Sequence, residues 1–342
     1  MKKYLSILTA LFAVLFTSCS NDDIPVMHET VFKVDPSTVI SSYLEYNVGD
    51  LTSFSSGNKL RIRLLAYDED GVLVASDESF SNDYTHIQTF NFALPEGNYT
   101  TVAITDVVSS TTEFYTLSNQ ERLNTTTITS TGKIGLQSGI LGLTTETHYV
   151  SSYTNDINIK VKPAGALIVY SINNWNACLD YVDKNTGEKV NIESYALLAN
   201  QVSGDLTLNS VGEPIYSITS STDYDYLWTL HTRNSNKTGG YGYIFKFPMS
   251  SVKLKWVGET FNDKVYSWGD AAVVNIEAGK EYYFELNVDT NEAEWLVLDL
   301  SSRKSANLFN TNNSNATLNQ NFNLMIKDEP VSIKAIDYLK KK

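Results

Sequence analysis

Short segments in which every second residue is apolar, separated by turn-forming residues, constrain this chain of 342 residues more than any other feature. In the clearest segment, Leu60–Ala66, apolar residues alternate with Arg61 and Arg63, the pattern of a β-strand with one face in water. The following residues, Tyr67–Gly71, are rich in acidic side chains and end in glycine, which suits a tight turn. The sequence therefore predicts a β-hairpin over Leu60–Ser76.

The same reasoning predicts a first block of strands around this hairpin. A second hairpin is expected to pair Ile87–Ala93 with Tyr99–Ile104 across the turn Leu94–Asn98. The other strands predicted in this block are Val31–Val34, Tyr43–Tyr46, Glu113–Thr116, Thr126–Thr129 and a strand around Lys133–Leu143. Short strands with turns about every eight to twelve residues are typical of a β-sandwich or barrel.

A polar stretch, Thr144–Asn155, separates this block from a second one that begins at Ile157–Val161 and ends with the hairpin Tyr282–Val288 and Glu294–Leu298. The strands predicted between them are Ala166–Ile172, Asp205–Leu208, Ile215–Ile218, Tyr226–Leu230, Tyr243–Phe247, Val252–Trp256 and Ala272–Ile276. The turn Leu94–Tyr99 resembles Ile276–Tyr282, because each places a glycine before an aromatic-led strand. We therefore expect an all-β chain with two related, tandem β-sandwich domains, at residues 29–150 and 155–300.

The N-terminus has the features of a lipoprotein signal peptide over residues 1–18. Two lysines precede the apolar run Tyr4–Phe16, which is too short to span a bilayer. Small residues at Thr17 and Ser18 come directly before Cys19, an arrangement that resembles the lipobox of bacterial lipoproteins, although Phe16 stands where Leu or Val is usual. We expect acyl chains such as palmitate on Cys19 and a stable outer-membrane anchor. The alternative is an ordinary secretory signal in which this cysteine is incidental.

Residues 19–28 are predicted to form a tether next to the lipid. Asp22 and Asp23 resemble the surface-export signal of Bacteroidetes lipoproteins, which predicts exposure on the cell surface. The alternative is a solvated tether, because such segments favour Asp and Asn in any case.

Charge and cysteine content exclude several classes of protein. The net charge of −13 becomes −15 once Lys2 and Lys3 are removed, so a nucleic-acid partner is not expected. After acylation of Cys19 only Cys178 remains, and no disulfide can form within the chain.

No signature of an enzyme is present in the sequence. It contains no nucleophile elbow, no zinc-binding His-Glu-x-x-His motif and no phosphate-binding loop. The histidines occur singly, at His28, His86, His148 and His231. Asp68, Asp70 and Gly71 resemble the start of a calcium loop, but the further ligands are missing and hairpin turn chemistry explains them. We therefore expect no catalytic residue, no cofactor and no metal.

The five tryptophans all lie in the second block, and one group of aromatic residues admits two interpretations. Tyr224, Tyr226 and Trp228 occupy alternate positions, so on a strand they would share one face. An exposed face of this kind could stack on sugar rings, whereas a buried one would fill the sandwich core.

The C-terminal region, residues 301–342, combines a polar linker with a predicted hairpin. Ser301–Gln320 is rich in Asn, Ser and Thr, and Phe322–Ile326 could pair with Val331–Ile336.

The segments Leu60–Val74 and Phe92–Ala103 resemble the fimbrillin superfamily of Bacteroidales, and most of all its FimB-like fimbrial anchor and minor subunits. The resemblance implies two transthyretin-like, Greek-key β-sandwich domains and assembly with other fimbrial subunits by β-strand exchange. Stalk subunits of this family are matured by cleavage after a basic residue, but no Arg and only Lys33 occur between Cys19 and Gly57. This departure favours an anchor or terminating subunit.

Within this resemblance the C-terminal segment is the candidate donor strand. The apolar residues expected to enter a partner's groove are Phe322, Leu324, Ile326, Val331, Ile333 and Ile336. The alternative is a strand that packs on its own domain.

Three functions follow from the sequence. The first is a fimbrial anchor or minor subunit on the outer membrane that supports cell adhesion. The second is an outer-membrane glycan-binding lipoprotein of a polysaccharide-uptake system, and the third is a structural lipoprotein without an extended partner.

Overall fold

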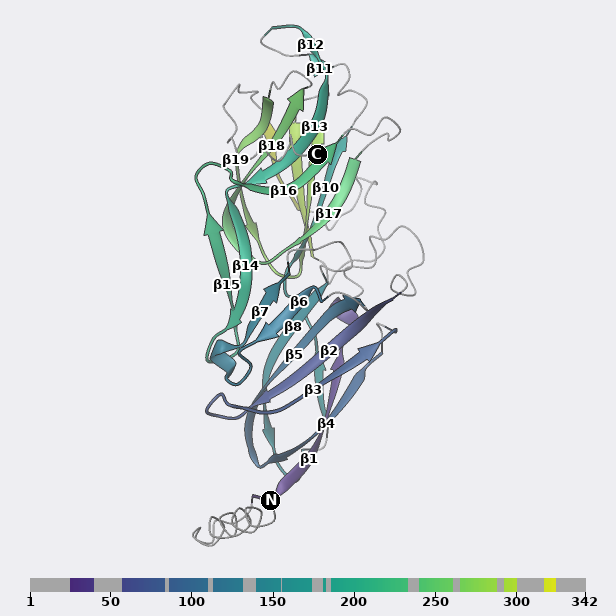
Figure 1. Ribbon diagram of the computed structural model, residues 1–342, viewed down its shortest axis with the longest axis vertical. Helices are drawn as coiled ribbons and strands as arrows, with labels where there is room; N and C mark the ends of the chain where they lie inside the picture. Colours follow the sequence, from purple (N-terminus) through teal and green to yellow (C-terminus); the bar gives the residue numbers. More distant parts are fainter. Residues whose placement is uncertain are drawn as a thin grey trace, which may run out of the picture.

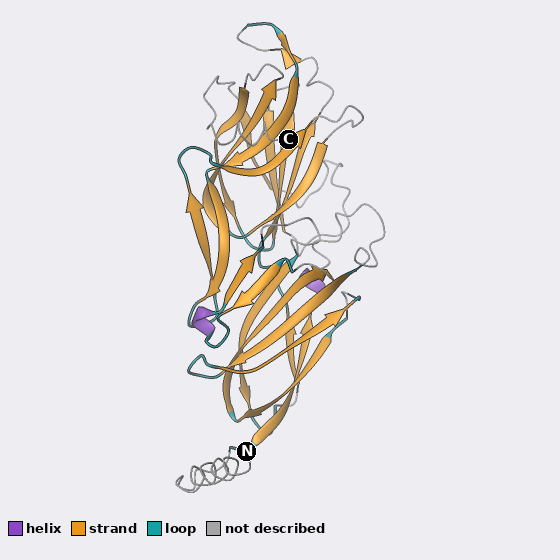
Figure 2. Cartoon of the chain, viewed as in Figure 1, coloured by secondary structure: helices purple, strands orange, loops and turns teal. Residues whose placement is uncertain are grey.

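A computed structural model describes residues 25–39, 57–83, 86–109, 113–131, 140–154, 156–173, 181–182, 186–232, 240–260, 265–287, 292–299 and 317–323. Strands make up most of these residues and helices almost none, so the prediction of an all-β fold is confirmed (Figure 2). No helix within these ranges is long and apolar enough to cross a membrane.

Side chains alternate between buried and exposed in Met27–Asp35, Gln88–Pro95 and Asp156–Lys160, as the sequence pattern predicts. By contrast, residues 60–67 and 101–108 are buried on both faces. In chain order the strands are β1 (Met27–Asp35), β2 (Asn58–Tyr67), β3 (Leu73–Ser81), β4 (Gln88–Pro95), β5 (Gly97–Ser109), β6 (Tyr115–Ser118), β7 (Thr127–Ser130), β8 (Leu141–Val150), β9 (Asp156–Lys160), β10 (Ala166–Asn173) and β11 (Tyr181–Val182). They continue as β12 (Lys189–Val190), β13 (Ile192–Ala199), β14 (Gln201–Leu208), β15 (Pro214–Ser220), β16 (Tyr226–Thr232), β17 (Gly240–Lys246), β18 (Met249–Thr260), β19 (Val265–Ile276), β20 (Lys280–Asn287), β21 (Glu292–Asp299) and β22 (Thr317–Asn323). A short 3-10 helix, η1 (Leu123–Thr125), lies between β6 and β7.

The first sandwich packs a three-stranded sheet, β4-β1-β9, against a four-stranded sheet, β3-β2-β5-β8. Phe32 and Phe92 from the smaller sheet and Ile62 and Leu64 from the larger one belong to one buried cluster. Such side chains supply the apolar burial that stabilises the sandwich.

The second sandwich repeats this arrangement with different strands. Its two sheets have the orders β17-β10-β20-β21-β22 and β16-β13-β18-β19, and Ile168, Tyr195, Trp256 and Tyr282 lie in the buried cluster between them. In each sandwich the first strand pairs in parallel with a late strand, β1 with β9 and β10 with β20. The order β4-β1-β9 matches β17-β10-β20, and β3-β2-β5-β8 matches β16-β13-β18-β19, so seven strands recur with the same connections.

A fifth large sheet joins the two sandwiches, which are stacked along the long axis of the molecule (Figure 1). Its order is β15-β14-β7-β6. The hairpin β6–β7 is inserted between β5 and β8 of the first sandwich, and β14–β15 is inserted between β13 and β16 of the second. We call this four-stranded sheet the shared sheet.

Two predicted hairpins are confirmed, and a third is wrong. The strands β2 and β3 pair antiparallel, as do β20 and β21. By contrast, β4 pairs with β1, whereas β5 pairs with β2 and β8, so the turn at residue 96 carries the chain from one sheet to the other. The turn after Ile276 joins β19 to β20 and is not its counterpart; the equivalent connection in the second sandwich is the one from β17 to β18.

Other segments also differ from the sequence prediction. Most of the polar stretch Thr144–Asn155 forms the second half of β8, because its threonines suit an edge strand with one exposed face. The strand at 157–161, expected at the start of the second block, is largely β9, which pairs with β1 of the first sandwich. The strand β13, an apolar run without clear alternation, was not predicted. The predicted strand at Tyr43–Tyr46 and most of the region 133–143 lie outside the described residues.

Candidate functional site

The shared sheet is the candidate functional site, because both sandwiches depend on it for their connection. β7 and β14 pair antiparallel, with Thr207 opposite Thr127 and Leu206 opposite Ile128. The hydroxyls of the two threonines are 3.1 Å apart. The main-chain N–H of Leu208 donates a hydrogen bond of 3.0 Å to the carbonyl oxygen of Thr126, so residues of the second sandwich extend a sheet of the first.

Apolar side chains from both sandwiches pack beneath this sheet as one core. Ile128 and Leu206 are fully buried, and the Tyr115 ring lies 6.5 Å from the Phe245 ring and 6.4 Å from the Phe247 ring, measured between centroids. These residues belong to the same buried cluster as the core of the first sandwich. Each fully buried side chain of this size contributes about 1.5–3 kcal/mol, so the connection is a hydrophobic core and not a flexible linker.

The tip of the β14–β15 hairpin is held against the first sandwich by polar contacts. Thr145 on β8 donates a hydrogen bond of 2.8 Å from its hydroxyl to the carbonyl oxygen of Gly212. Gly212 has φ of 81°, and a Cβ at this position would collide with the Thr145 side chain. At the middle of the junction the Tyr216 hydroxyl donates to the carbonyl oxygen of Ala164, at 3.3 Å.

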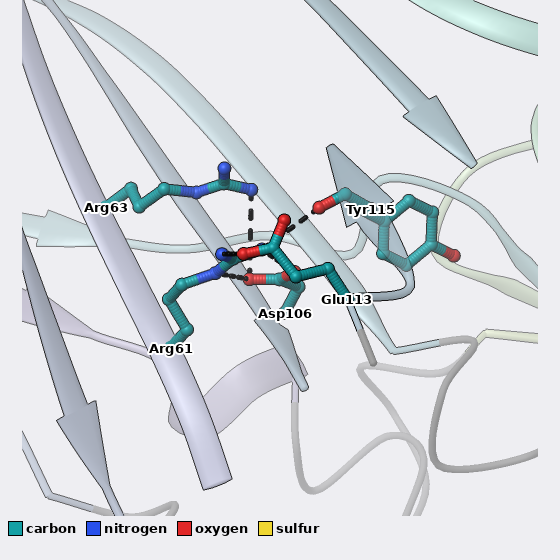
Figure 3. Close-up of polar contacts among 5 residues, drawn as sticks. All are labelled: Arg61, Arg63, Asp106, Glu113 and Tyr115. Atoms are coloured by element: carbon teal, nitrogen blue, oxygen red, sulfur yellow. Dashed lines mark hydrogen bonds and ion pairs between the residues drawn. The ribbon is translucent and has the colours of Figure 1, made fainter. Parts of the chain in front are cut away.

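A buried ion pair ties the base of the shared sheet to the first sandwich (Figure 3). Arg61 on β2 and Asp106 on β5 lie directly opposite each other, and the guanidinium donates from Nε and Nη2 to the two carboxylate oxygens at 3.0 and 2.8 Å. Nη2 also donates to the carbonyl oxygen of Tyr115 at 3.0 Å, and Nη1 donates to Glu113 at 2.6 Å. Arg61 thus links the central strands of the first sandwich to β6, the edge strand of the shared sheet.

The prediction that Arg61 and Arg63 face water is wrong. Their exposed fractions are 4% and 9%, because β6 and η1 lie over the outer face of the larger sheet. The Tyr67 hydroxyl on the same face is 2.7 Å from the Thr126 hydroxyl. The sequence held one signal of this burial, since Asp106 interrupts an otherwise apolar strand and a buried carboxylate requires a cation.

The electrostatics of this cluster follow from burial and charge balance. Burial raises the pKa of Asp106, while the hydrogen bonds from Arg61 and the charge of Arg63 oppose that rise. Burial also disfavours the charge of Arg61, but Asp106 and Glu113 outweigh this and raise its pKa. Arg63, whose Nη2 is 3.9 Å from Asp106, has a pKa lowered by burial. The cluster holds a fixed internal charge pair, which suits a structural connection.

Trp228, one of the three aromatic residues considered as a sugar-stacking platform, does not present an accessible ring. Trp228 on β16 is only 4% exposed, lies in the core of the second sandwich and donates from Nε1 to the carbonyl oxygen of Gln201. Tyr224 precedes the strand and has φ of 53°, and Tyr226 is half-buried against the same core. A ring stacks on a sugar only when its face is accessible, so the core interpretation applies to Trp228.

The other predicted site residues are distributed as follows. Asp68 accepts hydrogen bonds from the main-chain N–H groups of Asp70 and Val72, which is hairpin turn chemistry. Phe322 lies on β22 opposite Ala293, so this part of the candidate donor segment pairs with β21. The remaining candidates lie outside the described residues: Cys19, Asp22, Asp23, Leu324, Ile326, Val331, Ile333 and Ile336.

No protein-family model and no curated protein sequence matches this chain. Among solved structures, a proposed adhesin of Bacteroides thetaiotaomicron is 11% identical, with a TM-score of 0.46 over 80% of this chain and 97% of the other. The fimbrial anchor protein Mfa2 of Porphyromonas gingivalis is 10% identical, with a TM-score of 0.41 over 76% of this chain and 90% of the other. The C-terminally truncated tip fimbrial protein Mfa3 of the same organism is also 10% identical, with a TM-score of 0.41 over 80% and 100%. Fimbrial proteins of Bacteroidales are thus among the solved structures that this chain resembles.

Proposed function

We propose that this protein is a surface lipoprotein that serves as a fimbrial anchor or minor subunit and supports cell adhesion. The observation that carries the proposal is that the first and the last described strand point to opposite ends of the molecule. β1 begins at the end of the first sandwich that is farthest from the second (Figure 1), and β22 ends at Asn323, opposite Glu292 at the end of the second sandwich away from the junction. One end is therefore available for a membrane and the other for a partner.

The first end suits the predicted lipid anchor. Met27, the first residue of β1, pairs with Pro95 at the outer end of the first sandwich, whereas Asp35 accepts a hydrogen bond from Val161 near the junction. Cys19 precedes Met27 by eight residues, which span at most about 28 Å when fully extended. An acylated Cys19 would therefore keep the first sandwich close to the membrane.

The opposite end suits a partner subunit. β20 runs away from the junction, β21 returns, and β22 runs outward again, since Asn323 lies opposite Glu292 and Thr317 opposite Val297. The segment 324–342 continues from that outer end, and fully extended it could reach about 60 Å. Its alternating apolar residues, from Leu324 to Ile336, are of the type that adds as a strand to another sheet.

The shared sheet between these ends suits an anchor that carries load. In a pull between the membrane and a filament, the β7–β14 pairing would resist separation of the two sandwiches beside the covalent link from β9 to β10. The buried Arg61–Asp106 ion pair would hold β6 of the shared sheet on the first sandwich, and water does not compete readily for its hydrogen bonds.

The test uses the host strain, from which surface filaments and outer membranes are isolated and probed for the protein. The full-length chain should occur in membranes and with filaments. Cys19→Ala should release protein and filaments into the medium, whereas deletion of residues 324–342, which leaves β22 in place, should keep the protein in membranes without filaments. Finding the full-length protein in membranes with no filament partner would refute the fimbrial role.

A further inference from the structure

β15 forms an open edge of the shared sheet. It pairs with β14 on one side, and in the part of the chain that the structure describes no strand pairs with its other side. Figure 1 shows β15 on the flank of the molecule, running along the long axis from the first sandwich toward the second. The contacts of Gly212 with Thr145 and of Ser221 with Asn200 fix these two ends of the hairpin.

The outward backbone groups of β15 can be assigned from its hydrogen bonds to β14. Ser221 donates to the carbonyl oxygen of Asn200, and Glu213 accepts from the N–H of Asn209. In an antiparallel pair these bonds involve alternate residues, so the odd-numbered residues of β15 turn their N–H and C=O groups toward β14. Tyr216, Ile218 and Ser220 therefore direct theirs outward.

Apart from Pro214 at its first position, β15 has none of the residues that usually protect an edge. The strand Pro-Ile-Tyr-Ser-Ile-Thr-Ser has no charged residue, although the chain carries a net charge of −13. Ile215 is 57% exposed and Ile218 is 43% exposed. Edge strands that remain unpaired usually carry charges; β3, for example, has Asp77 and Glu78 in its middle.

We propose that β15 pairs antiparallel with β15 of a second copy of this chain. With Ser217 opposite its own copy, Tyr216 lies opposite Ile218 of the partner subunit, and the two exchange main-chain hydrogen bonds. Aromatic and β-branched residues form favourable cross-strand pairs. Glu213, at the start of the hairpin strand, falls opposite Ser221 and not opposite another carboxylate. The uncharged strand is thus complementary to itself, although the net charge of −13 makes two copies of the chain repel each other elsewhere.

The antiparallel pairing of β15 fixes the relative orientation of the two copies. Because β15 runs along the long axis, antiparallel pairing makes the two molecules antiparallel and puts their N-terminal ends on opposite sides. If each N-terminal end is anchored in a membrane, as in the proposed function, the two copies belong to facing surfaces. The contact would then join one cell to another. A strand of seven residues gives a small interface, so many weak contacts would act together.

The test uses soluble protein starting at Asn21 and two substitutions at one position. Ile218→Pro removes an outward N–H without removing a hydrogen bond to β14, while Ile218→Thr keeps the N–H. In sedimentation equilibrium the parent and Ile218→Thr should approach twice the monomer mass as concentration rises, whereas Ile218→Pro should stay monomeric with an unchanged unfolding midpoint. A parent that stays monomeric at all concentrations, or an Ile218→Pro variant that dimerises equally, would overturn the proposal.

A second readout tests the facing arrangement without the native lipid. Beads that carry the protein through a biotin at its N-terminus should clump with the parent and with Ile218→Thr, and stay dispersed with Ile218→Pro. Dimers in solution with no clumping of beads would overturn the facing arrangement. Because the biotin replaces Cys19, this result does not depend on whether the protein is lipidated or fimbrial in cells.

Discussion

The two sandwiches share the order and direction of seven strands, yet they differ at one end of their central strands. In the first, Arg61 on β2 lies opposite Asp106 on β5; in the second, Ser194 on β13 lies opposite Glu259 near the same end of β18. The first pair is covered by β6, inserted in its own sandwich, and the sheet of β6 continues through β7 into β14 of the other sandwich. The comparison shows that both sandwiches use the same seven-strand arrangement, whereas the connection between them is built from the hairpin that each sandwich inserts.

The hairpins β6–β7 and β14–β15 are inserted at different points of the two sandwiches, and the shared sheet requires both of them. β6–β7 is a pair of four-residue strands, and β14–β15 projects from the second sandwich onto the side of the first. A two-stranded hairpin alone is marginally stable in water, so each insertion gains its stability from the other and from the core beneath them. Substitutions in this region should therefore affect both sandwiches.

The largest effect should come from Asp106→Ala. It leaves Arg61 and Arg63 buried without their carboxylate, and such a loss costs about 3–5 kcal/mol in the free energy of unfolding. Urea denaturation of the soluble protein measures it. Glu113→Gln is the control, because that carboxylate is 56% exposed and should matter by about 1 kcal/mol or less. Equal small effects of both substitutions would contradict the structural role of the ion pair.

Leu206→Ala should cost about 2–4 kcal/mol, because this side chain is fully buried under the shared sheet. Ile215→Ala on the same hairpin is the matched control, since its side chain is largely exposed and its loss should change unfolding little. Chemical denaturation followed by tryptophan fluorescence reports the second sandwich, where all five tryptophans lie. If both substitutions had the same effect, the hairpin would not be part of the core.

Gly212→Ala should cost about 2–3 kcal/mol. The substitution forces a Cβ onto a positive φ and against the Thr145 side chain. Gly187→Ala has a similar φ of 71° with open space around it, so it should cost only about 1 kcal/mol. The difference between their thermal midpoints isolates the contact of the hairpin with the first sandwich, and equal midpoints would mean that this contact is absent.

Lys246→Met should have the smallest effect, and it should be stabilising. Burial lowers the pKa of Lys246 to about 8, and its ammonium lies 5.3 Å from the centre of the Trp228 ring, which offsets part of the cost of the charge. Because the folded pKa is below the unfolded value, the charged form destabilises the fold at pH 7, and stability is recovered as pH rises from about 8 to 10.5. Part of this side chain reaches solvent, so we expect a gain of about 1–2 kcal/mol at pH 7. Unfolding curves between pH 7 and 10.5 should converge for parent and variant; a constant gap would exclude this ionisation.

The sequence alone predicts correctly those elements that depend on neighbouring residues. The alternation in Leu60–Ala66 and the turn chemistry of Asp68 identify β2 and its hairpin with β3, because both depend on neighbouring residues. It failed where a distant segment decides the outcome. Arg61 is buried because Tyr115 on β6, 54 residues along the chain, lies over its face, and no pattern within β2 reports that cover. Likewise, the turn between β4 and β5 does not determine that β5 pairs with β2 in the other sheet and not with β4.

The candidate site was missed for the same reason. The strands at Thr126–Thr129 and Asp205–Leu208 were each predicted, but their pairing joins segments about eighty residues apart, and each has ordinary composition. The one local signal was the aspartate in the apolar strand β5. The signals that the sequence did emphasise, Cys19 and the segment after Phe322, lie at the two ends of the chain, and their roles remain proposals.

The central claim is that the shared sheet holds the two sandwiches in one fixed arrangement. The most direct test is the distance distribution between spin labels at Ser76 and Ser250, exposed positions in the first and second sandwich, by pulsed electron resonance in a Cys178→Ser background without Cys19. The account predicts one narrow distance that broadens when residues 201–220 are replaced by a short Gly-Ser linker. A broad distribution in the unaltered protein would show that the sandwiches move independently and would contradict it.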